Sequence, residues 1–304
     1  MNRVEVEHYP FRMKEDPRIV GREIFSQINT LFENPMFSDT KRDLSYNLFF
    51  HFQNASNMFC EESEMRERGY PNANLFYHDR DHSVFQATYD ALAITQAVLT
   101  ENNHLASHLT PEGIFSIPLG SIYHDTGFVY GANLDESFAG RNSIHVEKSI
   151  KAAEEAIDQI GIPRCLNLDK VKKLVTIGIQ GTHFPYDAER REEGRKLLGQ
   201  LSQEDRKEAQ IVRLAVQFAD LGGQTARVDQ NPEGLRRLRD EMNACTPNMG
   251  TKIIGKDERE IEEKRKQFLE FVVEKTVGKT GNAFFGTSDH SFAREWHKTP
   301  TASR

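Results

Sequence analysis

The chain is poor in cysteine and has no long apolar run. Its three cysteines, Cys60, Cys165 and Cys245, stand far apart and form no CxxC pair, which excludes a zinc knuckle or a disulfide framework. No apolar stretch approaches the roughly 20 residues that a bilayer-spanning helix needs, and the first residues lack the apolar core of a signal peptide. We therefore expect reduced thiols, no membrane association and a cytoplasmic protein.

A surplus of positive charge is also missing. The formal net charge is -7 at pH 7 for 304 residues, and the pI is about 5.9. Such a balance argues against broad electrostatic binding to a nucleic-acid polymer or to an acidic membrane face. An anionic substrate would need a different source of positive charge, and a bound metal ion would provide it.

Signals for β-strands are absent as well. Apolar residues recur at helical spacing, and no pair of alternating segments flanks a tight Asn-Gly or Asp-Gly turn. The sequence therefore predicts an all-α fold. The predicted helices cover Ile19–Phe32, Lys41–Ser56, Ser83–Thr100, Phe115–His124, Ser143–Ile160, Leu168–Gly181, Gln203–Ala219, Glu233–Asn243 and Asp257–Val277.

The chain shows no internal repeat, low-complexity tract or clear linker. We interpret residues 1–304 as one helical bundle, with a metal-binding core at about 75–225 and peripheral helical extensions at 1–60 and 246–304. Three longer segments are predicted to be irregular: 61–74, 127–142 and 246–255.

The motif IYHDTG, at Ile122–Gly127, follows a long apolar run. An aspartate in this position is expected to be partly buried, and a buried carboxylate needs a cation or several hydrogen-bond donors beside it. His124 and Asp125 are therefore candidate metal ligands. The alternative is an ordinary polar pair at a helix end.

Two further motifs carry candidate ligands. YHDRDH places His78 and His82 four residues apart, so that they share a face if one helix includes both; alternatively, Asp79 or Asp81 only caps the helix. Asp220, in FADLGG, ends an apolar helix, where the macrodipole disfavours a carboxylate. A metal ion would explain that position.

His145 and His183 complete the candidate set, although either could be an ordinary core or surface histidine. The order His, His-Asp, His, His, Asp, with each member on or at the end of a separate predicted helix, is how a helical bundle builds a metal site. Six such ligands could hold two divalent ions with a shared water. His104 and His108, also four residues apart, lie in a polar stretch and are interpreted as surface residues.

As a set, the candidate ligands resemble the signature of the HD-domain superfamily of metal-dependent phosphohydrolases, over about Tyr77 to Asp220. The resemblance implies an HD-domain, phosphodiesterase-like helical fold and one or two divalent ions, with Mn, Zn, Mg, Fe and Ni as candidates. It implies these metal ligands: His82, His124, Asp125, His145, His183 and Asp220.

YHDRDH is also similar to the Tyr-His-Asn-x-x-His motif of class I cyclic-nucleotide phosphodiesterases. This likeness implies that His78 protonates the leaving oxygen and that His82 binds metal. The match is partial, because Asp79 replaces the asparagine, NSIHVEKSI has one histidine where that family has two, and no base-clamping glutamine can be placed. THFPYD also lacks the paired histidines and Gly-Tyr-Pro of cyclic-di-guanylate phosphodiesterases. The sequence supports the reaction type better than a cyclic-nucleotide substrate.

In the expected mechanism, Asp125 is catalytic as a bridge between two ions. The first ion is completed by His82, His124 and Asp220. The second ion is completed by His145 and His183. Two carboxylates against about four positive charges leave the site cationic, so it could bind phosphate and activate a water molecule.

The expected activity is that of a phosphodiesterase or a nucleotide-type phosphatase. The expected substrate is a small phosphorylated molecule, with a nucleotide as one option. Arg80, Arg141 and Arg227 are candidate phosphate contacts, the alternative being solvated arginines. The sequence is compatible with either a monomer or a homo-oligomer. Two rival functions remain, a di-iron oxygenase of the HD superfamily, such as those resembling inositol oxygenase, and a non-catalytic regulatory HD domain, whose degraded ligand set this sequence does not show.

Overall fold

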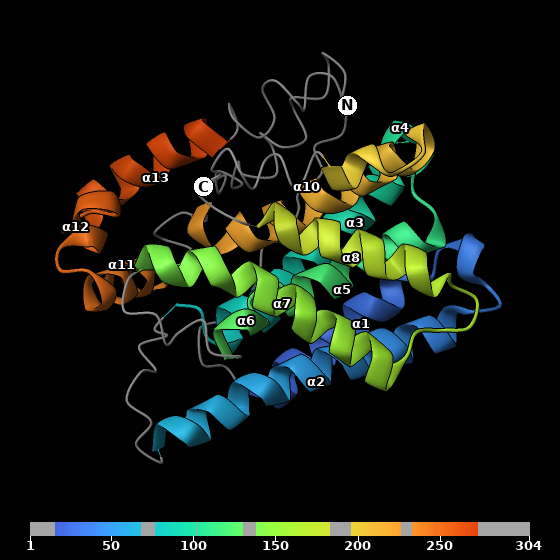
Figure 1. Ribbon diagram of the computed structural model, residues 1–304, viewed down its shortest axis with the longest axis horizontal. Coiled ribbons are helices and arrows are strands. Elements are labelled where there is room, and N and C mark those ends of the chain that lie inside the picture. The colour runs from blue at the N-terminus through green and yellow to red at the C-terminus, as the bar shows by residue number, and fades with distance from the viewer. Residues whose placement is uncertain are drawn as a thin grey trace, which may run out of the picture.

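The computed structural model describes residues 16–67, 77–101, 103–129, 138–182, 196–225 and 233–272. Within these ranges the chain forms helices and no strand, which confirms the all-α prediction (Figure 1). The elements are α1 (Pro17–Leu31), the 3-10 turn η1 (Pro35–Phe37), α2 (Lys41–Glu67), the π-helical turn η2 (Asp81–Gln86), α3 (Ala87–Glu101), α4 (Asn103–Ala106), α5 (Pro111–Tyr123), α6 (Thr126–Val129), α7 (Phe138–Ile160), α8 (Leu168–Gly181), α10 (Gln203–Thr225), α11 (Gly234–Cys245), α12 (Met249–Ile253) and α13 (Glu258–Val272).

Helix α5 is the centre of the bundle. Every residue from Gly113 to Tyr123 is buried, and α5 packs against α2, α3, α8 and α10. A helix that is apolar on all sides is stable only when other helices surround it. It begins at Pro111 and not at the predicted Phe115, because Thr110 caps it by accepting a hydrogen bond from the Gly113 amide and proline is favourable in the first turn.

The surrounding helices are amphipathic, as their spacing predicts. Helix α8 has the predicted bounds and buries Val171, Leu174, Val175 and Ile179 on one face. Its first turn is capped by Asn167, whose side chain accepts a hydrogen bond from the Lys170 amide. The pattern therefore predicts this helix fully, since its inward face and its cap agree.

The segments predicted to be irregular are partly helical. Helix α2 continues through Glu67, and its end, CEESEMRE, contains neither proline nor glycine and is rich in good helix formers. Segment 127–142 contains the end of α6 and the start of α7, and 246–255 contains α12. The N-terminal helices are also more than an extension, because α1 and α2 contribute Val20, Ile24 and Leu48 to the main core.

Helices α11, α12 and α13 lie together at one end of the bundle, in orange to red in Figure 1. A second, smaller apolar cluster joins α11 to the segment that precedes η2 through Tyr77, Leu238 and Met242. Among the residues with described positions, none of the helices combines the length and apolar character that crossing a bilayer requires.

A buried histidine ties three helices together close to the centre. The Nδ1 and Nε2 atoms of His51, on α2, lie 3.0 Å from the Tyr123 hydroxyl and 3.0 Å from the Gly161 carbonyl oxygen, respectively. A carbonyl only accepts, so Nε2 carries the proton and Nδ1 accepts from Tyr123. Gly161 follows α7 and has a φ of 80°, a conformation that glycine adopts without strain. His51 thereby fixes the ends of α5 and α7 against α2.

Stability should depend on pH through His51. Burial lowers the pKa of His51 to about 4, against a backbone contact to Gly161 that acts in the opposite direction. The unfolded chain takes up this proton near pH 6.5 and the folded chain does not, so the free energy of unfolding falls as the pH falls between these values. Between pH 7.5 and 5, urea unfolding should reveal about 2 kcal/mol more destabilisation in the wild type than in His51→Gln. An identical pH dependence in both proteins would contradict this role.

Candidate metal centre

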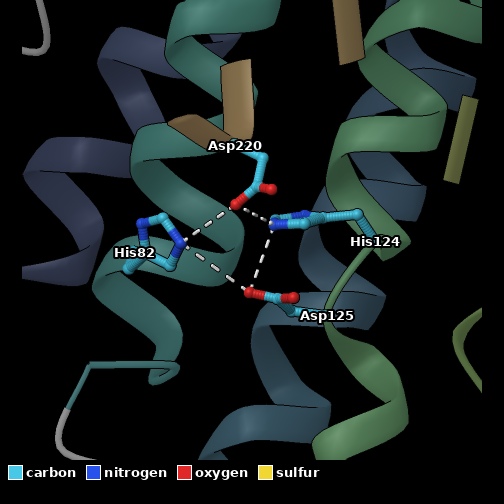
Figure 2. A group of neighbouring side chains, drawn as sticks. All are labelled: His82, His124, Asp125 and Asp220. Carbon is cyan, nitrogen blue, oxygen red and sulfur yellow. Dashed lines mark ion pairs between the residues drawn. The ribbon is translucent and has the colours of Figure 1, made fainter. Parts of the chain in front are cut away.

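Four buried side chains from three parts of the fold converge on one point. His82 comes from η2, His124 and Asp125 follow α5, and Asp220 lies on α10. Figure 2 shows the two imidazole rings and the two carboxylates directed toward a common centre. The Nε2 atom of His82 lies 3.8 Å from Asp125 Oδ2 and 3.5 Å from Asp220 Oδ1. For His124 Nε2 the corresponding distances are 3.1 and 3.4 Å.

These distances suit the ligands of one ion. Ligand atoms about 2.1 Å from a metal are roughly 3.0 Å apart at octahedral angles and roughly 3.4 Å apart at tetrahedral angles. The four ligand atoms all lie within 4.8 Å of one another, and the measured contacts range from 3.1 to 3.8 Å. The four contacts between the imidazole nitrogens and the carboxylate oxygens thus lie within a few tenths of an ångström of the spacing expected around one divalent ion.

The hydrogen bonds of the two histidines point to a cation. His124 Nδ1 lies 2.8 Å from the Ser121 carbonyl oxygen, so that nitrogen carries a proton and Nε2 is the nitrogen directed at the carboxylates. His82 Nδ1 is similarly 3.5 Å from Gln86 Oε1. Both Nε2 atoms are buried and have no hydrogen-bond partner in the described part of the chain. Imidazole nitrogens this close to carboxylates need either a proton or a metal ion between the two groups, and metal-bound imidazoles have the same arrangement.

The charges of the cluster agree with this interpretation. Burial acts to lower the pKa of His124, but Asp125 and Asp220 outweigh it and raise that pKa well above its ordinary value. Burial acts to raise the pKa of Asp125, yet His124 and neighbouring histidines hold it well below its usual range. Two ionised carboxylates thus meet in a buried space, where they attract either protons on the imidazoles or a metal ion in their place. The cluster could hold a metal ion.

His145 lies on the other side of Asp125. Its Nε2 atom is 3.8 Å from Asp125 Oδ1, whereas Oδ2 of the same carboxylate faces His82 and His124. Burial lowers the pKa of His145 to about 4, so the ring is neutral at pH 7, as a metal ligand must be. The two oxygens of Asp125 therefore face different groups, the two histidines of the cluster on one side and the neutral imidazole of His145 on the other.

A glycine sets the distance between α6 and α7. A Cβ atom on Gly127 would lie 1.9 Å from the backbone oxygen of His145, and the Gly127 amide donates to Ser149 Oγ at 2.8 Å. The close approach places the Phe128 ring between two histidine rings, with centroids 4.5 Å from His78 and 4.6 Å from His145. Backbone contact thus fixes His145 relative to His78.

His78 is held by a carboxylate that the sequence analysis did not identify. Its Nδ1 atom lies 2.7 Å from Glu241 Oε1, and Glu241 Oε2 accepts from the amides of Tyr77 and His78 at 2.8 and 3.2 Å. Burial acts to lower the pKa of His78, but Glu241 outweighs it and raises the pKa to about 9. A signal existed, because Glu241 is an acidic residue on the apolar face of its helix, beside Met242.

His78 and His82 do not share a helix face. Tyr77, His78 and Asp79 precede the helical turn, so the spacing of four residues does not place the two histidines on one face of a helix. The two rings are nevertheless close, with centroids 5.9 Å apart. The alternative interpretation was right only about the cap: Asp79 Oδ1 accepts from the amides of Asp81 and His82, but His78 and His82 are both buried and do not face water.

The remaining predicted site residues are placed only in part. The Arg80 guanidinium lies 5.3 Å from the centroid of the Phe85 ring. His183, Arg227 and the side chain of Arg141 lie outside the described residues. His104 is exposed beside His108, in agreement with its interpretation as a surface residue.

Comparison with known proteins adds no further assignment. No protein-family model, curated protein or solved structure matches the chain. The buried cluster of two histidines and two aspartates, with His145 and the His78–Glu241 pair beside it, is therefore the basis for a functional assignment.

Proposed function

We propose that the protein is a metal-dependent phosphohydrolase of the HD-domain type, a phosphodiesterase or a nucleotide-type phosphatase. The observation that carries the proposal is the pair of buried, unpartnered imidazole nitrogens facing two buried carboxylates in the described part of the chain. Such a donor set suits borderline and hard divalent ions, with Mn, Zn, Mg, Fe and Ni as candidates. Proteins seldom bury four such groups together without a function for them.

His82, His124, Asp125 and Asp220 would hold the first ion. Asp125 and His145, with His183, would hold a second. When bound, divalent ions would lower the pKa of a water molecule and neutralise charge on phosphoryl oxygens. The protein's own contribution is to exclude bulk water, since all four cluster residues are buried, and to fix the ligand directions through Ser121 and Gln86.

His78 would hold the proton that the leaving oxygen receives. Glu241 binds its Nδ1 atom and thereby directs the opposite nitrogen, Nε2, away from α11. The ring stacks on Phe128, which limits its rotation. A donor fixed in this way, close to the metal ligands, is arranged for general acid catalysis.

The proposed substrate is a small phosphorylated molecule. With a net charge of -7 the protein surface offers phosphate little attraction, so binding would depend on the metal ions and on a few local arginines. Arg80, Arg141 and Arg227 are the proposed contacts. A buried site of this kind suits a small molecule better than a nucleic-acid polymer.

The test combines elemental analysis with a substrate screen. The purified protein should contain one or two divalent ions per chain, and it should hydrolyse a phosphodiester or phosphomonoester without oxygen. Bis(p-nitrophenyl) phosphate, p-nitrophenyl phosphate and a panel of nucleotides serve as probes under anaerobic conditions. Bound iron with an oxygen-dependent optical or paramagnetic signal and no phosphoester turnover would instead favour the di-iron oxygenase. A protein without metal and without turnover would favour a regulatory domain.

A further inference from the structure

We infer that Arg237 and Asp79 form a positioning pair that fixes the segment carrying His78 and His82, and thereby sets the metal affinity of the site. The inference rests on the proposed function, because it deepens the account of the same site. Neither residue belongs to the ligand cluster.

Asp79 contacts the chain in two directions. Its Oδ1 atom accepts hydrogen bonds from the amides of Asp81, at 3.1 Å, and His82, at 3.3 Å, so it caps the π-helical turn η2. Its Oδ2 atom accepts from the Arg237 guanidinium. The carboxylate therefore couples the backbone of a metal ligand to a helix 158 residues later in the sequence. An amide at this position could still cap the turn but would carry no charge for the arginine.

Arg237 and Glu241 are one turn apart on α11, and both hold the segment that begins at Tyr77. Glu241 binds the start of this segment, through the Tyr77 amide and the His78 ring, and Arg237 binds Asp79 two residues later. The segment is thus held by one helix at two places. Rotation of the segment would move His78 and His82 together.

The Tyr77 ring adds an apolar contact between the segment and α11. It is fully buried against Leu238 and Met242, and its centroid lies 4.0 Å from that of the His82 ring. The side chains of Arg237 and Asp79 are 17% and 23% exposed, so the ion pair is partly shielded from water. Partly buried contacts of this kind orient metal ligands from outside the coordination sphere.

A double-mutant cycle tests the pair by Mn²⁺ titration calorimetry of the full chain. Arg237→Met and Asp79→Asn should each lower the Mn²⁺ affinity about 10-fold, and the double variant should lose no more than either single variant. Arg237→Lys should recover part of the loss. Arg236→Met is the matched control, because Arg236 pairs with Glu258 on the surface and should leave the affinity unchanged.

Hydrogen exchange provides a second readout that needs no metal. The amides of Asp81 and His82 should exchange faster in Arg237→Met than in the wild type or in Arg236→Met. The inference would be overturned if the losses of Mn²⁺ affinity in the two single variants added up in the double variant. It would also be overturned if the affinity and the exchange rates of the variants matched those of the wild type. A higher KM in Arg237→Met with unchanged Mn²⁺ affinity would make Arg237 a substrate contact instead. A wild type that binds none of the candidate ions Mn, Zn, Mg, Fe and Ni would count against the proposed function, while the exchange rates would still decide the pair.

Discussion

Asp125→Ala is expected to lose bound metal and phosphoester turnover together. Asp125 faces His124 with Oδ2 and His145 with Oδ1, so its removal takes a ligand from both sides of the site. The loss of turnover should exceed the roughly 10- to 100-fold that removal of an outer contact to a ligand costs. Elemental analysis and steady-state kinetics of the purified variant measure the two effects.

Asp158→Ala is the matched control for this substitution. Asp158 is an exposed aspartate that pairs with Lys172, and it does not belong to the cluster. The control should keep wild-type metal content and activity. Undiminished activity in Asp125→Ala would contradict the proposed mechanism, whatever the metal content.

His78→Asn is expected to keep its metal and to lose turnover of substrates with poor leaving groups by about 100- to 10,000-fold. The four cluster ligands are untouched, so metal binding should persist. Asparagine is preferable to alanine, because its amide can still donate to Glu241. In His78→Ala the buried Glu241 carboxylate would lose its partner, which would cost about 3–5 kcal/mol of folding free energy, enough to unfold a marginally stable protein.

The choice of leaving group provides the control for His78→Asn. A p-nitrophenolate needs little protonation, so its esters should lose much less rate than alkyl phosphoesters do. Equal losses for both substrates would mean that His78 does not supply the proton. Loss of metal would make His78 a ligand.

Sequence patterns predicted the helices well where packing and capping agree. Helix α8 has the predicted bounds because its apolar stripe and the cap at Asn167 both indicate the same start. The end of α2 was missed because its last residues have no apolar stripe, although their helix propensity is high. The π-helical turn at Asp81–Gln86 could not be predicted, because side-chain spacing hardly distinguishes it from an α-helix.

The site was predictable to the extent that its residues are unusual for their position. Asp125 follows the end of α5, and Asp220 lies at the predicted end of α10, although that helix continues to Thr225; both enter the cluster with His82 and His124. Glu241 is also a carboxylate in an unusual position, because it lies on the buried face of α11. The signal is weaker there, since the apolar face of α11 has few residues. The role of Gly127 depends on how closely two helices approach, which no local pattern encodes.

The placement of Glu241 late in the chain has a consequence for synthesis on the ribosome. All four cluster residues have been translated once residue 220 is added, whereas the carboxylate that orients His78 follows 21 residues later. At 5–20 residues per second this interval lasts roughly one to four seconds. A nascent chain therefore contains all four residues of the candidate metal cluster before it contains Glu241, the group that orients the proposed proton donor.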